Sequence, residues 1–138
     1  IRLNYQQNLR DDCKNFSLVA FGELAVEPVA RLIKHPDNRV RSAAVLTLNR
    51  ILEASPHFTN NMPLIDIIRD VLMQASTDEY PFVRIRAIDG LVQLKDPEAI
   101  DLIEQMAQND PYRAEYRPGM PYLVREAAMD ALRSLGAR

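Results

Sequence analysis

The sequence has no tryptophan, one cysteine and only four glycines, and each of these shortages excludes a kind of protein. The single thiol, Cys13, has no second cysteine with which to form an internal disulfide. It lies on the apolar stripe of a predicted helix, where a free cysteine behaves as a small hydrophobic residue. The glycines are scattered, so no glycine-rich loop could hold a phosphate. We therefore expect no disulfide scaffold and no nucleotide loop, and a reduced, cytoplasmic setting.

An excess of charge of one sign is also lacking. The chain has 17 basic and 19 acidic residues, which gives a formal net charge of -2. A groove that follows a nucleic-acid backbone needs a clear excess of Lys and Arg, and base stacking needs aromatic platforms. The apolar runs are only a few residues long, too short to cross a bilayer, and no signal peptide is visible. We expect neither nucleic acid nor a membrane as a partner.

What the chain does have is ample material for a core. Hydrophobic residues make up 47% of its 138 residues and charged residues 26%, both ordinary for a globular protein. This length fits a single domain covering residues 1–138. The sequence begins with Ile1 rather than Met, which is consistent with a fragment of a longer chain or a processed form.

One helical pattern recurs along the chain: Val, Arg, two residues, Ala, two residues, a small residue, Leu, two residues, and Leu or Ile. Clear copies begin at Val40, Val83 and Val124, and a degenerate copy begins at Cys13. The apolar and small positions, at offsets 0, 4, 7, 8 and 11 from the start, share one face of a helix. Small residues at offsets 4 and 7 let a neighbouring helix approach closely. The pattern predicts helices at 13–24, 40–51, 83–94 and 124–135.

A second set of helices is predicted between the first. Each opens with a proline, which fits a first helical turn because its missing N–H is not needed there. These helices are expected near 28–34, 63–75 and 97–108, with residues 1–10 as an earlier member. Asp96 is a good N-cap for the last of them. The alternation predicts an all-α superhelical solenoid of about four helix pairs, in which stacking buries a continuous core.

The Val-Arg-x-x-Ala-x-x-small-Leu core resembles the HEAT-repeat family, especially its bacterial subgroup named after phycobilisome lyases. The resemblance covers nearly the whole chain and implies a right-handed superhelix. In that family, a turn aspartate six residues before the arginine pairs with it, and Asp78 and Arg84 keep this spacing. His35 takes the aspartate's place in the turn before Arg41. Fifteen residues separate Asp110 from the arginine of the last copy, so the resemblance leaves two of these turn contacts open.

The resemblance also implies that the arginine-bearing helices line the concave side of the solenoid. Offsets 2, 6 and 9 point away from the apolar face at 100° per residue, and they would form the exposed stripe. The members of this stripe predicted to contact a partner are Val19, Leu46, Asn49, Ile85, Asp89, Val92, Glu126, Asp130 and Arg133. Its middle is apolar and its C-terminal end acidic, so the predicted partner is a protein or peptide of basic character. Neighbouring helices could equally cover the apolar members.

The segment 109–121 is longer than the usual connection of roughly 2–8 residues between helices. It carries side chains of the types enriched at binding hot spots. These are Tyr112, Arg113, Tyr116 and Arg117. The segment is either a tolerated surface insertion or a second contact site.

Residues that could carry chemistry are few. His35 and His57 are more than twenty residues apart in predicted turns, and with Cys13 they make neither a zinc site nor a nucleophile–base pair. The iron-binding members of the HEAT-like group carry repeated His-Glu pairs, and this chain has no His-Glu dipeptide. We therefore expect no cofactor, no metal and no catalytic residue.

The function predicted from the sequence is a non-catalytic scaffold that binds a protein or peptide on its concave face. Two alternatives remain. One is a lyase-type or lyase-accessory protein acting on bilin chromophores, which rests on the resemblance alone. The other is an accessory domain of a larger enzyme, which fits the missing initial Met.

Overall fold

The computed structural model describes residues 22–54 and 62–136. Residues 22–31 are helical and continue into the short 3-10 helix η1 (Leu32–Lys34). The helices that follow are α2 (Asn38–Ala54), α3 (Met62–Ala75), α4 (Pro81–Leu94), α5 (Pro97–Asn109) and α6 (Leu123–Ser134). The described ranges contain no strand. The predicted all-α solenoid is confirmed.

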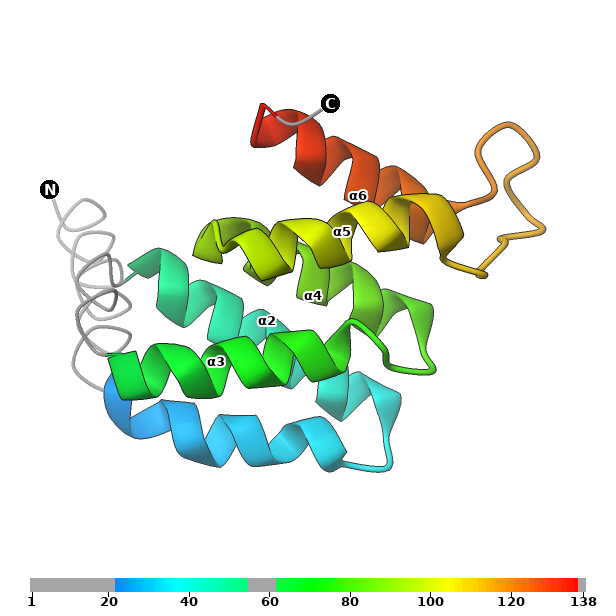
Figure 1. Ribbon diagram of the computed structural model, residues 1–138. Helices are drawn as coiled ribbons and strands as arrows, with labels where there is room; N and C mark the ends of the chain where they lie inside the picture. The colour runs from blue at the N-terminus through cyan, green and yellow to red at the C-terminus, as the bar shows by residue number, and fades with distance from the viewer. Residues whose placement is uncertain (1–21, 55–61, 137–138) are drawn as a thin grey trace, which may run out of the picture.

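The helices form two layers. Residues 22–34, α3 and α5 lie in one layer, and α2, α4 and α6 lie in the other (Figure 1). Successive members of the second layer contact one another, and α4 and α6 also pack on the first-layer helices that precede them. In the first layer, Arg69 of α3 pairs with Asp96 at the start of α5, at 2.7 Å. Three helix pairs are therefore stacked in the described part of the chain.

The core lies between the two layers and runs continuously through all three pairs. Large aliphatic side chains that are fully buried come from each of the labelled α-helices. They are Val45, Leu48, Ile51, Ile68, Leu72, Val83, Ile88, Leu91, Ile103 and Val124. Ala87 and Ala128, at offset 4 of their copies, are also fully buried, as the repeat predicts. No single pair could bury both of its faces, so the stack holds the fold together.

The ends of α5 show how local sequence sets a helix boundary. Asp96 is the N-cap of α5, and its side chain accepts a hydrogen bond from the backbone N–H of Glu98 at 2.9 Å. Pro97 occupies the first turn, as predicted. Lys95, between α4 and this cap, has a φ of 53°, in the left-handed region. This single residue reverses the chain, so that α5 packs directly beside α4.

The first described helix differs from its prediction. We expected a break before a helix starting at Pro28, but residues 22–31 form one helix that runs through Pro28. A proline inside a helix leaves the carbonyl four residues earlier without its partner, here that of Leu24. Both residues are exposed, and Leu24 is 74% exposed, so water can satisfy this carbonyl. Leu24 is thus not on a buried stripe. The other pattern residues of the degenerate copy fall within 13–21 and lie outside the described residues, as does the predicted helix 1–10.

Candidate functional site

The arginines at offset 1 of the copies in α2 and α4 each link their helix to the turns on both sides. Arg41 of α2 donates from Nε and Nη2 to the carboxylate of Asp78, at 2.8 Å and 3.1 Å. Its third nitrogen, Nη1, donates to the backbone carbonyl of His35 at 2.9 Å. The Arg41 and Asp78 side chains are both largely buried. The side chain therefore connects the turn before its own helix with the turn of the following pair.

The next copy repeats this geometry. Arg84 donates from Nε and Nη2 to Asp110 at 2.7 Å and 2.9 Å, and from Nη1 to the carbonyl of Asp78 at 2.8 Å. The expected side-chain pair between Asp78 and Arg84 is therefore wrong. Nη1 of Arg84 lies against the backbone of the turn before its own helix, and the edge of the guanidinium formed by Nε and Nη2 faces the next pair. The carboxylate of Asp78 is consequently used by the arginine of the preceding pair.

The turn before Arg41 uses a histidine where the other turns use an aspartate. Nδ1 of His35 accepts a hydrogen bond from the backbone N–H two residues later, at 3.0 Å. Asp78 and Asp110 each accept the same i+2 hydrogen bond through their carboxylates, at 2.9 Å and 3.0 Å. This acceptor role requires an unprotonated Nδ1. His35 is thus a turn residue that substitutes for the aspartate, as its place in the repeat indicates.

These links set α2, α4 and α6 side by side, and a groove runs along the layer they form. Its larger cavity has a volume of about 640 Å³ and is lined by residues of all three helices. The lining residues are Leu46, Asn49, Arg50, Glu53, Arg86, Asp89, Val92, Gln93, Ala127, Asp130, Ala131 and Ser134. An adjoining cavity of about 510 Å³ lies between the first halves of α2 and α4. It is lined by Arg39, Ser42, Ala43, Leu46, Tyr80, Phe82, Ile85 and Arg86.

Most of the predicted contact stripe lies along this groove. Leu46 lines both cavities, and Ile85 lines the smaller one. Asp89, Val92 and Asp130 line the larger. The aliphatic members are half-buried rather than enclosed in the core. The structure therefore brings together residues that lie more than eighty positions apart in the sequence.

Asn49 is a correction to the stripe. It was expected to be exposed, but it is only 3% exposed. Its Nδ2 donates to the carbonyl of Arg86 at 2.9 Å, and its Oδ1 lies where a side chain at Gly90 would begin, 2.2 Å from the position of a Cβ there. Asn49 therefore fastens α2 to α4 beneath the groove and is not available to a partner as an exposed contact.

Offsets 7 and 9 explain this burial, because they face opposite neighbours in the stack. Asn49, at offset 9 of α2, faces forward and meets Gly90, at offset 7 of α4, which faces back. Thr47, at offset 7 of α2, was expected to be buried but is exposed, because no described helix precedes it there. Arg133, at offset 9 of α6, is exposed because no described helix follows it. Burial at these two offsets thus depends on the position of the helix in the stack.

The remaining predicted residues of α6, Glu126 and Arg133, do not line the groove cavities. Arg133 pairs with Asp130 at 2.6 Å on the exposed surface. Glu126 is half-buried and does not line either groove cavity; its Oε2 is buried and has no hydrogen-bond partner among the described residues. Val19 lies outside the described residues.

The long segment between α5 and α6 projects from the end of the stack (Figure 1). Its base is anchored by Ala114, which is buried and donates its N–H to the carbonyl of Pro121 at 2.7 Å. Tyr112 packs edge-on against Phe82, with ring centroids 6.2 Å apart, at the rim of the smaller cavity. Burial, and then a hydrogen bond with Tyr116, raise the pKa of Tyr112. Arg113, Tyr116 and Arg117 are exposed and do not line the groove cavities.

Charges in the groove influence one another. Partial burial raises the pKa of the Asp89 carboxyl above its ordinary value of 3.8. The positive charge of Arg86 lowers this pKa, and the negative charge of Glu53 raises it. Nowhere in 22–54 and 62–136 do three or more His, Cys, Asp or Glu residues gather as metal ligands would. The lining of the larger cavity thus carries charges of both signs beside its apolar side chains.

Comparison with protein-family models agrees with this architecture. The model for the HEAT repeat matches residues 25–55, and the model for the PBS lyase HEAT-like repeat matches residues 83–109. The chain contains HEAT repeats. A search of curated proteins found no match, and neither did a search of solved structures. The lyase in the second model's name describes that repeat type, and a fold by itself assigns no activity to this chain.

Several groove residues of these HEAT repeats were missed by the prediction from offsets 2, 6 and 9. Arg86 lies at offset 3 of its copy, and Arg50 and Gln93 lie at offset 10 of theirs. These offsets lie beside offset 7, on the side of the helix between the core and the preceding neighbour, as the hydrogen bond from Gln93 of α4 to the carbonyl of Asn49 of α2 shows. The recurrence of polar residues at offset 10, where the third copy has Ser134, was a signal in the sequence that could have identified them.

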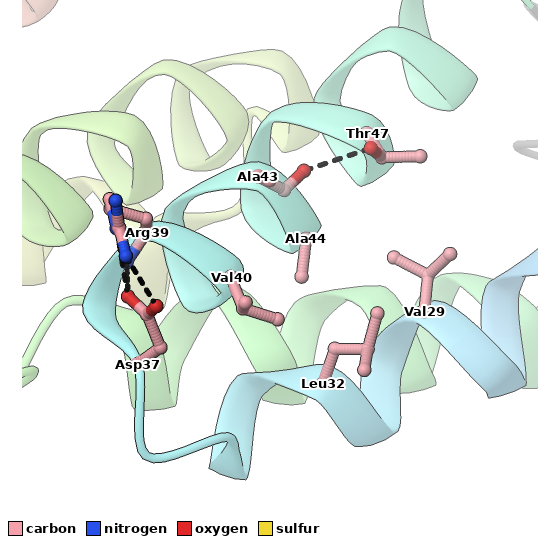
Figure 2. Close-up of a pocket in the computed structure, with 8 residues that line it drawn as sticks. All are labelled: Val29, Leu32, Asp37, Arg39, Val40, Ala43, Ala44 and Thr47. Atoms are coloured by element: carbon pink, nitrogen blue, oxygen red, sulfur yellow. Dashed lines mark hydrogen bonds and ion pairs between the residues drawn. The ribbon is translucent and has the colours of Figure 1, made fainter.

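A third cavity, of about 450 Å³, lies at the N-terminal side of the first described HEAT repeat. Figure 2 shows Val29 and Leu32 facing Val40 and Ala44 of α2 across it, with the ion pair of Asp37 and Arg39 at one end. Thr47 lines the same cavity and donates its hydroxyl to the carbonyl of Ala43 at 2.8 Å. The cavity therefore lies on the face of α2 that carries offset 7 and points away from α4.

No helix in 22–54 and 62–136 spans a membrane, since none is both long and apolar enough.

Proposed function

We propose that this chain binds a peptide segment of a partner protein in the groove formed by α2, α4 and α6, and that it does so as a scaffold without catalysis. The observation that carries the proposal is the pair of adjoining cavities, about 640 Å³ and 510 Å³, with Leu46 shared between them. Cavities of this size accommodate ligand groups and side chains. The repeat architecture supports it, because stacked helix pairs create extended concave binding surfaces.

The lining of the groove suits recognition of a peptide. Half-buried Leu46, Ile85 and Val92 offer apolar contacts without opening the core. Charged side chains surround them, with Asp89 and Asp130 on the side nearest α6. An apolar centre with a polar rim is the usual composition of a protein interface. The acidic side favours a partner with basic residues there, by charge complementarity.

The exposed loop between α5 and α6 is a second contact in this proposal. Tyr116 is 67% exposed, and Arg113 and Arg117 flank it on the same projecting segment. Tyr112, packed on Phe82, connects the base of the loop to the rim of the smaller cavity. A partner seated in the groove and extending past Phe82 would reach the loop next.

The test uses a random twelve-residue peptide library displayed on phage, selected on the immobilised protein. Selected peptides are then measured by fluorescence anisotropy on the parent protein, on the Leu46→Ser, Ile85→Ser double variant, and on Leu24→Ser. Each lost apolar anchor should weaken binding by about 1–3 kcal/mol, so the double variant should lose at least about tenfold in affinity. Leu24→Ser is the matched control, because Leu24 is exposed and lies outside the groove.

Thermal melts of the variants accompany the binding measurements. The double variant should remain folded, since both residues are only half-buried. Failure to select any peptide, or equal affinity for parent and double variant, would contradict the proposal. Unfolding of the double variant would show that Leu46 and Ile85 belong to the core. They could then not serve as the apolar contacts of the groove.

A further inference from the structure

The groove has two halves that follow one another along the helix axes. The smaller cavity is lined by residues 39–46 of α2 and 82–86 of α4, together with Tyr80. The larger is lined by 46–53 of α2 and 86–93 of α4, together with α6. Because residue numbers rise together on both helices, α2 and α4 run in the same direction past the groove. Their N-terminal halves border one cavity and their C-terminal halves border the other.

The first half is positively charged. Its lining contains two guanidinium groups, those of Arg39 and Arg86, and no carboxylate. Arg39 is paired with Asp37 at 3.0 Å, so part of its charge is already neutralised. Arg86 has no ion pair within the described part of the chain and is exposed. Beside these groups lie the apolar side chains of Phe82, Ile85 and Leu46.

The second half has the opposite balance. Glu53, Asp89 and Asp130 line it, against the two arginines Arg50 and Arg86. The helix dipoles act in the same sense, because the N-terminal end of a helix carries partial positive charge and the C-terminal end partial negative charge. Two helices running in the same direction therefore reinforce the charge difference between the halves.

We propose that this groove selects its peptide by charge order: an apolar side chain accompanied by carboxylates occupies the half next to Phe82 and Arg86, and basic side chains occupy the half next to Asp89 and Glu53. This proposal rests on the groove being the peptide site proposed above, and it adds the chemistry of the peptide. The charges of the groove specify the order of charges along the ligand, and they leave its N-to-C direction free.

The separation of the two halves sets the spacing of the charges. The parts of α4 that line them are centred about six residues apart, which is about 9 Å along a helix axis. An extended peptide covers that distance in about three residues. The preferred peptide therefore has its acidic residues beside the apolar anchor and its basic residues about three positions further along.

The experiment uses the peptides selected on the parent protein. For the strongest peptide we compare three synthetic forms by anisotropy: the original, a form with its acidic and basic residues exchanged, and a form with Gln in place of each acidic residue. Each is measured on the parent, on Arg86→Gln, and on Arg31→Gln, which removes an exposed arginine outside the groove. Salt is held constant throughout.

The exchanged peptide should bind at least about tenfold more weakly than the original, because each charge then meets its like in the groove. Arg86→Gln should weaken the original peptide by a similar factor but should leave the affinity of the Gln-substituted form unchanged. Arg31→Gln should alter neither.

Equal binding of the original and exchanged peptides would overturn the charge order while leaving peptide binding in the groove intact. An equal effect of Arg86→Gln on the original and on the Gln-substituted form would also overturn it. If the selected peptides bind the Leu46→Ser, Ile85→Ser variant as well as the parent, the groove is not the site, and both proposals fall together.

Discussion

Arg84 holds the carboxylate of Asp110, twenty-six residues later, with two hydrogen bonds of 2.7 Å and 2.9 Å. The same arrangement joins Arg41 to Asp78 one pair earlier. Each turn aspartate thus serves the arginine of the preceding pair, and the pairs are connected by charge as well as by apolar packing. The long segment before α6 leaves this link intact, because Asp110 stands at its start, directly after α5. Arg125 still reaches the turn, donating from Nε to the carbonyl of Asp110 at 2.7 Å.

Replacing Asp110 should therefore weaken the whole stack. The side chains of Arg84 and Asp110 are only 10% and 4% exposed, so Asp110→Ala leaves a buried guanidinium without its carboxylate. Breaking one partner of a buried pair costs about 3–5 kcal/mol. We expect a loss of this size in the free energy of unfolding, measured by urea denaturation. Asp37→Ala is the control, because its partner Arg39 is 86% exposed, and its effect should be much smaller. Equal effects would show that the buried link does not stabilise the stack.

Gly90→Ala should destabilise the contact between α2 and α4. A Cβ at this position would come within 2.2 Å of Asn49 Oδ1 and 2.7 Å of Leu72. Overpacking of this kind costs about 1–3 kcal/mol, which outweighs the gain of up to about 1 kcal/mol from replacing a helical glycine. Thermal melts should also show that Gly90→Ala costs less in an Asn49→Ala background, since one of the obstructing atoms is then gone. Gly119→Ala, where nothing lies within 4 Å, should be tolerated. Additive effects of the two substitutions would argue against the contact.

Two adjacent residues of α6 test the register of the repeat. Ala128 is fully buried, whereas Met129 is 40% exposed. Ala128→Glu places an unpaired carboxylate in the core at a cost of several kcal/mol, out of a total stability of roughly 5–15 kcal/mol. We expect Ala128→Glu to unfold the protein or nearly so, and Met129→Glu to melt close to the parent. Similar melting temperatures for the two variants would show that the buried face of α6 has been assigned wrongly.

Asp89 is expected to lower stability at neutral pH. Burial raises its folded-state pKa above the ordinary 3.8, so the folded protein holds this proton more tightly than the unfolded chain does. The free energy of unfolding therefore falls as the pH rises through this range. Asp89→Asn should melt at a higher temperature than the parent at pH 7, and the difference should shrink toward pH 3, where Asp89 is protonated in both states. Asp101→Asn, which removes a carboxylate of α5 outside the groove cavities, controls for the loss of one negative charge. A lower melting temperature for Asp89→Asn at pH 7 would contradict this account.

The sequence by itself determined the helices and their buried faces. The copies starting at Val40, Val83 and Val124 all form helices, and their offsets 4 and 8 are buried in each. Asp96 and Pro97 set the start of α5 as local capping chemistry predicts. These features depend on residues within one or two helical turns, where periodicity and capping act directly. The same periodicity correctly predicted that Leu46, Ile85 and Asp89 share the surface along which the groove runs.

Only the tertiary structure decided which of the residues that face away from the core remain exposed to solvent and available to a partner. Asn49 and Arg133 share offset 9, yet Asn49 is covered by α4 and Arg133 is exposed at the end of the described stack. Asp78 keeps the spacing to Arg84 but binds Arg41, because a guanidinium held against its own turn presents its free edge to the next pair. The charge difference between the two halves of the groove arises from Arg39 in one half and from Glu53, Asp89 and Asp130 in the other, and these residues come from three different helices. Periodicity assigns a side chain to a face of its own helix, and the packing of the neighbouring helices determines whether that face meets protein or solvent.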